Sequence, residues 1–114
     1  MKIIGKNDIE PKVVSADGQG NPAVGTSIQV LTPEAPNFVM RLFTLTPGGS
    51  TPLHAHPWEH EVFVVSGAGK TGGDREVAVG PGDAVYVAPN ETHCFVNTGD
   101  GDMKFICVVP KGAR

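Results

Sequence analysis

The sequence has 114 residues, a length that predicts one folded domain over residues 1–114. Its formal net charge of −3 and its scattered lysines and arginines argue against nucleic-acid binding, which needs a clustered basic face. No apolar run approaches the roughly 20 residues that span a bilayer, and the start of the chain lacks the apolar core of a signal peptide. We therefore expect a cytoplasmic protein with no membrane partner.

Short apolar runs alternate with turn residues along the whole chain. The 15 glycines and 10 prolines interrupt the sequence so often that no stretch keeps a helical period. This punctuation is typical of many short strands. It predicts an all-β fold, either a β-barrel or a jelly roll.

In chain order, the pattern predicts about eight strands. The first part of the chain, to about residue 25, is predicted as an extension or edge strand that ends in a turn-rich stretch. The strands expected after it are 26–31, 38–45, a short one carrying His54 and His56, 61–65, 75–79, 84–87, 93–96 and 103–109. Residues 46–49 and 67–69 are predicted to be turns.

Three of the four histidines lie within seven residues of one another. Residues two apart in a strand project from the same face, so His54 and His56 are expected to point together, and His60 begins the next strand. Two imidazoles on one strand and a third on its neighbour make a chelating arrangement for a transition metal. Glu61 has the parity of the opposite face, which argues against a carboxylate ligand.

The histidine segment carries a family resemblance. Gly48, followed by His54 and His56 and closed by Gly67, resembles the first motif of the cupin family. His60 stands where many cupins place a glutamate. Residues 82–97 resemble the second cupin motif.

In that second motif, Gly82 precedes the ligand position His93, and Asn97 follows four residues later. Asn90 replaces a glycine that is common in the family, a mild departure because asparagine tolerates the left-handed conformation. The resemblance covers roughly residues 35–111. Within the family, the sequence resembles the small single-domain bacterial cupins of the cupin 2 conserved barrel type that have a four-histidine manganese site.

This resemblance implies a conical barrel with one divalent transition metal inside, held by His54, His56, His60 and His93. It also implies a homodimer. Manganese or iron is the ion that the resemblance favours, whereas affinity alone favours copper, and imidazole also suits nickel, cobalt and zinc. Four neutral ligands leave the full 2+ charge on the ion and two octahedral positions for a substrate, a peroxide or dioxygen.

Strand alternation predicts the wall of the pocket. An inward His93 brings Phe95 inward and leaves Cys94 outside, and Phe105 and Cys107 share an inward face of the last strand. Trp58 lies in the ligand turn, where it either rims the mouth of the pocket or simply packs.

An apolar surplus is expected on the outer wall, where Phe43, Leu45, Phe63 and Val65 are predicted to lie. A partner chain or a second sheet would have to cover it. Arg41 is the one charged residue in its strand. It is either an exposed residue at a dimer contact or a pocket cation that holds an anionic oxygen.

These features leave two hypotheses of function. The first is a metal-dependent oxidoreductase of the dioxygenase or peroxide-using class, acting on a small aromatic or alkene substrate. The second is a non-catalytic module that binds or senses a small carboxylate or phenol. A decarboxylase or isomerase ranks third, because each needs an acid–base partner that the pocket lacks.

Overall fold

The structure is a computed structural model that describes residues 1–113. It contains one short 3₁₀ helix, η1 (Lys6–Asp8), and nine strands. The strands are β1 (Lys12–Ala16), β2 (Pro22–Val30), β3 (Phe38–Ser50), β4 (His60–Ser66), β5 (Gly69–Gly73), β6 (Ala78–Val79), β7 (Ala84–Val87), β8 (His93–Asn97) and β9 (Met103–Pro110). None of the helices within residues 1–113 is long and apolar enough to cross a membrane.

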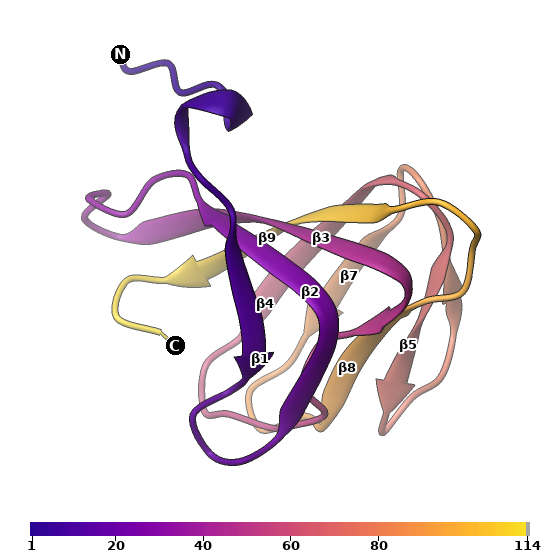
Figure 1. The fold of residues 1–114 in the computed structure, drawn as a ribbon. Helices are drawn as coiled ribbons and strands as arrows, with labels where there is room; N and C mark the ends of the chain where they lie inside the picture. The colour runs from indigo at the N-terminus through magenta and orange to yellow at the C-terminus, as the bar shows by residue number, and fades with distance from the viewer. Residues whose placement is uncertain (114) are drawn as a thin grey trace.

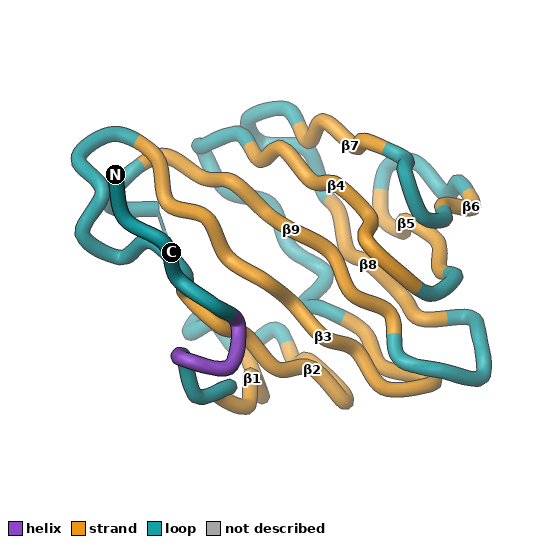
Figure 2. The backbone as a smooth tube through the Cα atoms, turned by 90° about the horizontal axis from the view of Figure 1, so that it is seen from above, coloured by secondary structure: helices purple, strands orange, loops and turns teal. Residues whose placement is uncertain are grey.

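The nine strands form one antiparallel sheet that curls on itself into a half-barrel (Figure 1). The order is β6-β5-β8-β3-β9-β4-β7, and β2 pairs with β3 while β1 continues that edge. Figure 2 shows β3, β9 and β4 running side by side, with β2 and β1 curling away at one end. The all-β jelly-roll fold predicted from the sequence is therefore confirmed.

One predicted turn is wrong and a second is one residue too long, for reasons that lie in backbone pairing. Residues 46–49 belong to β3, which bulges there: β2 pairs with β3 at Thr26–Leu45 and again at Val24–Ser50, so four residues of β3 loop out. Gly69 begins strand β5 instead of closing a turn, because it pairs with Asn97 of β8. Turn residues in the sequence did not reveal either pairing.

Other predicted bounds also differ. The strand predicted over 75–79 is limited to β6, and the edge strand expected in the first part of the chain is β1. The segment that carries His54 and His56 is a loop, and not a strand. Within it, only His54 is bridged, to His93 of β8.

The core lies on the concave face of the sheet. Phe105 and Cys107 of β9 are buried there, as predicted, with Phe95 of β8 beside them. Phe43 and Leu45 were predicted outside, and that is wrong. Their partners across β3 and β9 are Phe105 and Met103, and paired residues share one face of the sheet. Cys94 is also buried, but it does not belong to the core cluster and alternates along β8 with the inward His93 and Phe95, as predicted.

The convex face divides into a covered end and an open end. At the covered end, the buried Gln29 side chain donates hydrogen bonds to the backbone carbonyls of Lys6 and Ile9, which holds the N-terminal segment against β2. At the open end, Phe63 and Tyr86 are 50% and 57% exposed. The outward apolar surplus predicted for Phe63 and Val65 is therefore present.

Candidate metal centre

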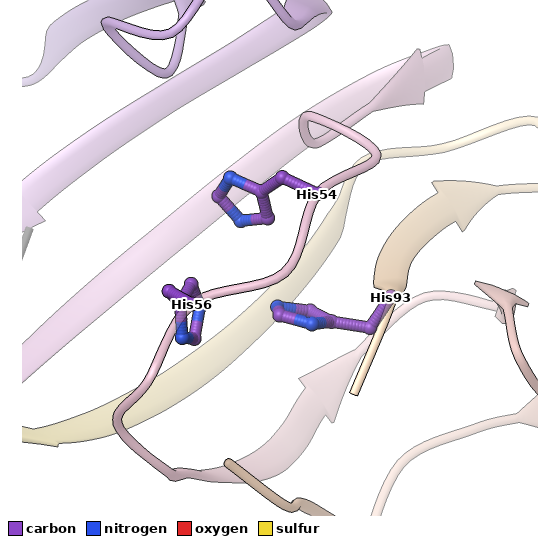
Figure 3. A group of neighbouring side chains, drawn as sticks. All are labelled: His54, His56 and His93. Atoms are coloured by element: carbon purple, nitrogen blue, oxygen red, sulfur yellow. The ribbon is translucent and has the colours of Figure 1, made fainter. Parts of the chain in front are cut away.

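The four histidines come together at one end of the half-barrel. His54 and His56 come from the loop between β3 and β4, and His60 and His93 are the first residues of β4 and β8. Figure 3 shows the rings of His54, His56 and His93 turned toward one space between the loop and β8. One ring nitrogen from each of these three residues lies within 4.8 Å of the others.

The partners of the Nδ1 atoms fix which nitrogen of these three rings faces that space. His56 Nδ1 lies 2.9 Å from the carbonyl oxygen of Trp58, and His93 Nδ1 lies 2.8 Å from that of Glu91. His54 Nδ1 lies 2.9 Å from Asp17 Oδ2. Because carbonyl and carboxylate oxygens only accept, each Nδ1 carries the proton and each Nε2 keeps a lone pair.

His60 adjoins the same group from β4. Its ring stacks on that of His56, with centroids 4.3 Å apart, and its centroid lies 5.3 Å from that of His93. His60 Nδ1 lies 2.9 Å from the thiol sulfur of Cys107, which can accept a hydrogen bond from it, and His60 Nε2 lies 2.6 Å from His56 Nε2. Two such nitrogens repel one another unless a proton or a cation lies between them.

Burial favours the neutral form of the His56, His60 and His93 imidazoles. It lowers the pKa of His56 and of His93 below their ordinary value, and the neighbouring histidines add to the effect. Burial, reinforced by His56 and the Arg41 guanidinium, lowers the pKa of His60 to about 2. Neutral imidazoles with free lone pairs are the form in which histidine binds a metal. The residues present therefore fit a divalent transition ion.

A cavity of about 220 Å³ opens beside the histidines. His54, His60 and His93 line it together with three aromatic rings, those of Phe43, Phe95 and Phe105. The other residues that line it are Val14, Ala16, Asp17, Ile28, Arg41, Thr51, Pro52 and Cys107. Phe95, Phe105 and Cys107 thus lie where strand alternation placed them.

Arg41 also lines this cavity. Its Nη2 lies 3.1 Å from Cys107 Sγ and 3.5 Å from His60 Nδ1, and its guanidinium lies over the Phe43 ring, 5.2 Å from the centroid. Arg41 Nε is buried and has no hydrogen-bond partner among residues 1–113. Of the two alternatives left open for Arg41, this placement favours the pocket cation.

Trp58 lies outside the cavity wall and stacks on the far side of the site. Its ring is nearly parallel to that of His56, with an interplanar angle of 5° and centroids 4.4 Å apart. Trp58 therefore supports a histidine from behind. Glu61 is exposed, as its parity predicted, and Asn97 is buried and donates to the carbonyls of Leu45 and Gly101.

The sequence did not predict a role for Asp17, which lies in the turn between β1 and β2, 37 residues from the histidine that it contacts. The only local signal was an aspartate followed by Asn21 in a glycine-rich turn. A hydrogen bond from the Asn21 side chain, with others from Gln19 and His54, holds the pKa of Asp17 well below its ordinary value.

Comparisons with known proteins support the fold described above. The family model Cupin_2, described as a cupin domain, matches residues 41–109. The polyketide cyclase RemF from Streptomyces resistomycificus is 34% identical in sequence to this chain. Its structure superposes with a TM-score of 0.84, and the match covers 96% of this chain and 79% of that chain. An oxalate-binding protein of Thermotoga maritima is 29% identical over 94% of this chain and 92% of its own length.

A third similar protein supports the fold alone. A predicted oxalate decarboxylase of Thermotoga maritima has a crystal structure that is 23% identical, with a TM-score of 0.80, and the match covers 96% of this chain and 99% of that one.

Proposed function

The chain belongs to the cupin family, and from that premise we propose that it is a metal-dependent oxidoreductase. Its substrate is a small aromatic or alkene molecule, and its oxidant is dioxygen or a peroxide. The proposal places the chain in the four-histidine subgroup, with one ion per chain held through Nε2 of His54, His56, His60 and His93. Manganese is the ion favoured by the family resemblance, with iron next.

The donor set supports this chemistry. Three of the rings present Nε2 lone pairs because an acceptor fixes the proton on Nδ1, and the fourth ring lies against them. Four neutral ligands leave the whole 2+ charge available to an anionic or oxygen ligand. A redox-active divalent ion supplies Lewis acidity and one-electron chemistry at such a site when it is bound.

The cavity supports a small aromatic or alkene substrate. Phe43 and Phe105 stack with centroids 5.1 Å apart, and Phe95 lies 4.9 Å from Phe105, so an aromatic wall adjoins the histidines. Such a wall binds an apolar ring and excludes water from the reacting atoms. Arg41 supplies the one cation that lines the cavity within residues 1–113, and it orients an anionic oxygen toward the histidines.

The shortage of acid–base groups favours metal-centred oxidation over decarboxylation or isomerisation. Asp17 is the one carboxylate that lines this cavity within residues 1–113. Both of its oxygens already accept hydrogen bonds, from Gln19, Asn21 and His54. A carboxylate engaged in this way is a poor proton donor or base.

The single observation that carries the proposal is the convergence of the imidazole Nε2 atoms beside a phenylalanine-lined cavity. To test it, metal-free protein is loaded in parallel with Mn²⁺, Fe²⁺, Cu²⁺ or Zn²⁺. Consumption of dioxygen or of an organic peroxide is then followed with a panel of aryl alkenes and flavonols. We expect substrate-dependent consumption with a redox-active ion and none with Zn²⁺, and no consumption with any ion would contradict the proposal.

Two observations favour a second candidate, the binding of a small carboxylate without turnover. The Arg41 guanidinium faces the cavity, and a relative that is 29% identical is described as an oxalate-binding protein. Calorimetric titration of Zn²⁺-loaded protein with oxalate measures this directly. Tight binding of oxalate, with no oxidant consumed under any ion, would replace the first proposal with the second.

The similarity to a polyketide cyclase favours a redox-neutral version of the same site. In that case a Zn²⁺-loaded protein would convert a phenolic polyketone without any oxidant. The Zn²⁺ arm of the same experiment, with such a substrate included, separates the two reaction types.

A further inference from the structure

The turn between β1 and β2 is built around the Asp17 carboxylate. Asp17 Oδ1 accepts from the backbone N–H groups of Gln19 and Asn21, at 2.7 and 3.1 Å. Asp17 Oδ2 accepts from Asn21 Nδ2 at 2.7 Å. The side chain is only 6% exposed, so its place is fixed by these bonds and by packing.

The same oxygen reaches across to the loop that carries the first histidine. Asp17 Oδ2 lies 2.9 Å from His54 Nδ1, and the His54 side chain is 18% exposed. His54 is the least buried of the four rings. His56 shares its loop, but the His56 ring is stacked on the rings of Trp58 and His60. The orientation of this ring therefore depends on its Nδ1 partner more than that of the other three.

The hairpin of β1 and β2 also supplies part of the cavity wall, through Val14, Ala16 and Ile28. Both strands lie outside residues 41–109, the part of the chain that the cupin family model matches. The hairpin and the histidine loop are thus brought together by the fold, and Asp17 is the polar contact between them.

We infer that Asp17 is a positioning residue of the metal centre, which holds His54 as the Nδ1–H tautomer with Nε2 directed at the ion, and that the β1–β2 hairpin is part of the site. The inference rests on the proposed metal site. Carboxylates that accept the second N–H of a ligating histidine fix its tautomer, and their loss typically weakens metal binding by about 10- to 100-fold.

Zinc affinity of three variants tests this inference. Asp17→Asn places an amide N–H₂ opposite either the His54 donor or the turn donors. Asn21→Ala removes a bond of the turn but leaves the His54 contact. Asp8→Asn makes the same charge change in η1, where the Asp8 carboxylate accepts only from Gly5 N–H at an exposed position. Affinity is measured by competition for Zn²⁺ with a chromophoric chelator.

We expect Asp17→Asn to weaken Zn²⁺ binding by about 10- to 100-fold, and Asp8→Asn to bind like the unmodified chain. Asn21→Ala is expected to lose clearly less affinity than Asp17→Asn. Equal losses of Zn²⁺ affinity in Asp17→Asn and Asn21→Ala would show that the conformation of the turn, and not the contact with His54, supports metal binding. An unchanged Zn²⁺ affinity in Asp17→Asn would overturn the inference outright.

A second readout does not depend on the metal. Long-range ¹H–¹⁵N NMR of the histidine rings reports the tautomer of His54 in metal-free protein. The unmodified chain can be measured in this way even if the Asp17→Asn variant fails to fold. We expect Nδ1–H in the unmodified chain and a shift toward Nε2–H in Asp17→Asn. An Nε2–H tautomer in the unmodified chain would overturn the inference. If that tautomer is Nδ1–H but Zn²⁺ does not bind, the proposed metal site fails while the contact stands.

Discussion

The two parts of the chain that surround the cavity differ in what they supply. Residues 41–109, which the family model matches, contribute four imidazoles, Arg41 and the aromatic wall. The β1–β2 hairpin contributes one carboxylate and three apolar side chains, and no metal-binding nitrogen. The first part holds the groups proposed to bind an ion, whereas the second part supplies the Asp17 contact to one of them and completes the cavity wall.

The histidines also differ in what fixes the orientation of their rings. His56 and His93 donate to backbone carbonyls of their own neighbourhood, Trp58 and Glu91, so their orientation is set locally. His54 depends on a side chain from a distant hairpin. Changes in the matched part should therefore remove the site, and changes in the hairpin should only weaken it.

The largest effect is expected for His93→Ala. Removing a ligand should cost more than the roughly 10- to 100-fold expected for a supporting residue. The variant should also lose the stabilisation by Zn²⁺, which at a hundredfold excess over Kd amounts to about 2.7 kcal/mol in the unmodified chain. Elemental analysis and thermal unfolding with and without Zn²⁺ measure both, and a full equivalent of metal in His93→Ala would contradict the assignment.

Acid should destabilise the metal-free protein through the buried rings. His56, His60 and His93 have lowered pKa values in the folded chain, so below about pH 6.5 the unfolded chain binds protons that the folded chain does not. The free energy of unfolding should fall with pH by up to about 1.4 kcal/mol per pH unit for each ring.

Urea unfolding of metal-free protein at a series of pH values between 7.5 and 5 measures this dependence. His60→Ala should show a shallower slope than the unmodified chain, since one buried ring is gone. A stability that stays constant or rises between pH 6.5 and 5 would show that these rings are protonated in the folded state.

Arg41→Leu should weaken oxalate binding to the Zn²⁺-loaded protein while metal content stays at one equivalent. Loss of a hydrogen bond to a charged group is worth about 1.5–3 kcal/mol, or roughly 10- to 150-fold in affinity. Arg41→Lys should recover part of the loss, because lysine keeps the charge but lacks the planar fork. If Arg41→Leu binds oxalate normally but changes the oligomeric state, Arg41 belongs to a contact between chains.

The smallest effect on the site is expected from substitutions on the convex face of the sheet. We propose that a second copy of the chain covers the apolar patch of Met40, Phe63, Val65 and Tyr86, all at least 40% exposed. Phe63→Glu should shift a dimer toward monomer in light scattering and leave Zn²⁺ affinity unchanged. Val13→Glu, at an exposed apolar position on β1, is the matched control, and a monomeric unmodified chain at micromolar concentration would rule out the dimer.

Features that depend on local pattern could be predicted from the sequence. Strand alternation placed Phe95, Phe105 and Cys107 on the inner face, and the left-handed conformation proposed for Asn90 is present, with a φ of 66°. The clustering of His54, His56 and His60 followed from spacing alone, and the family resemblance added His93.

Features that depend on pairing between distant segments could not be predicted. The inward positions of Phe43 and Leu45 follow from the register of β3 against β9, which nothing within β3 reveals. The contact between Asp17 and His54 requires the β1–β2 hairpin to fold over the end of the half-barrel. Each of these features follows from the topology, which the local periodicity of a single sequence does not predict.

The proposed metal site consists of four imidazoles, His60 among them, around a single ion. A crystal structure of Zn²⁺-loaded protein, with anomalous diffraction collected at the zinc edge, locates that ion. We expect one ion about 2.0–2.1 Å from Nε2 of His54, His56, His60 and His93. An ion held by three of these rings with His60 Nε2 still paired to His56, or one bound by Glu61 or the Cys107 sulfur, would contradict it.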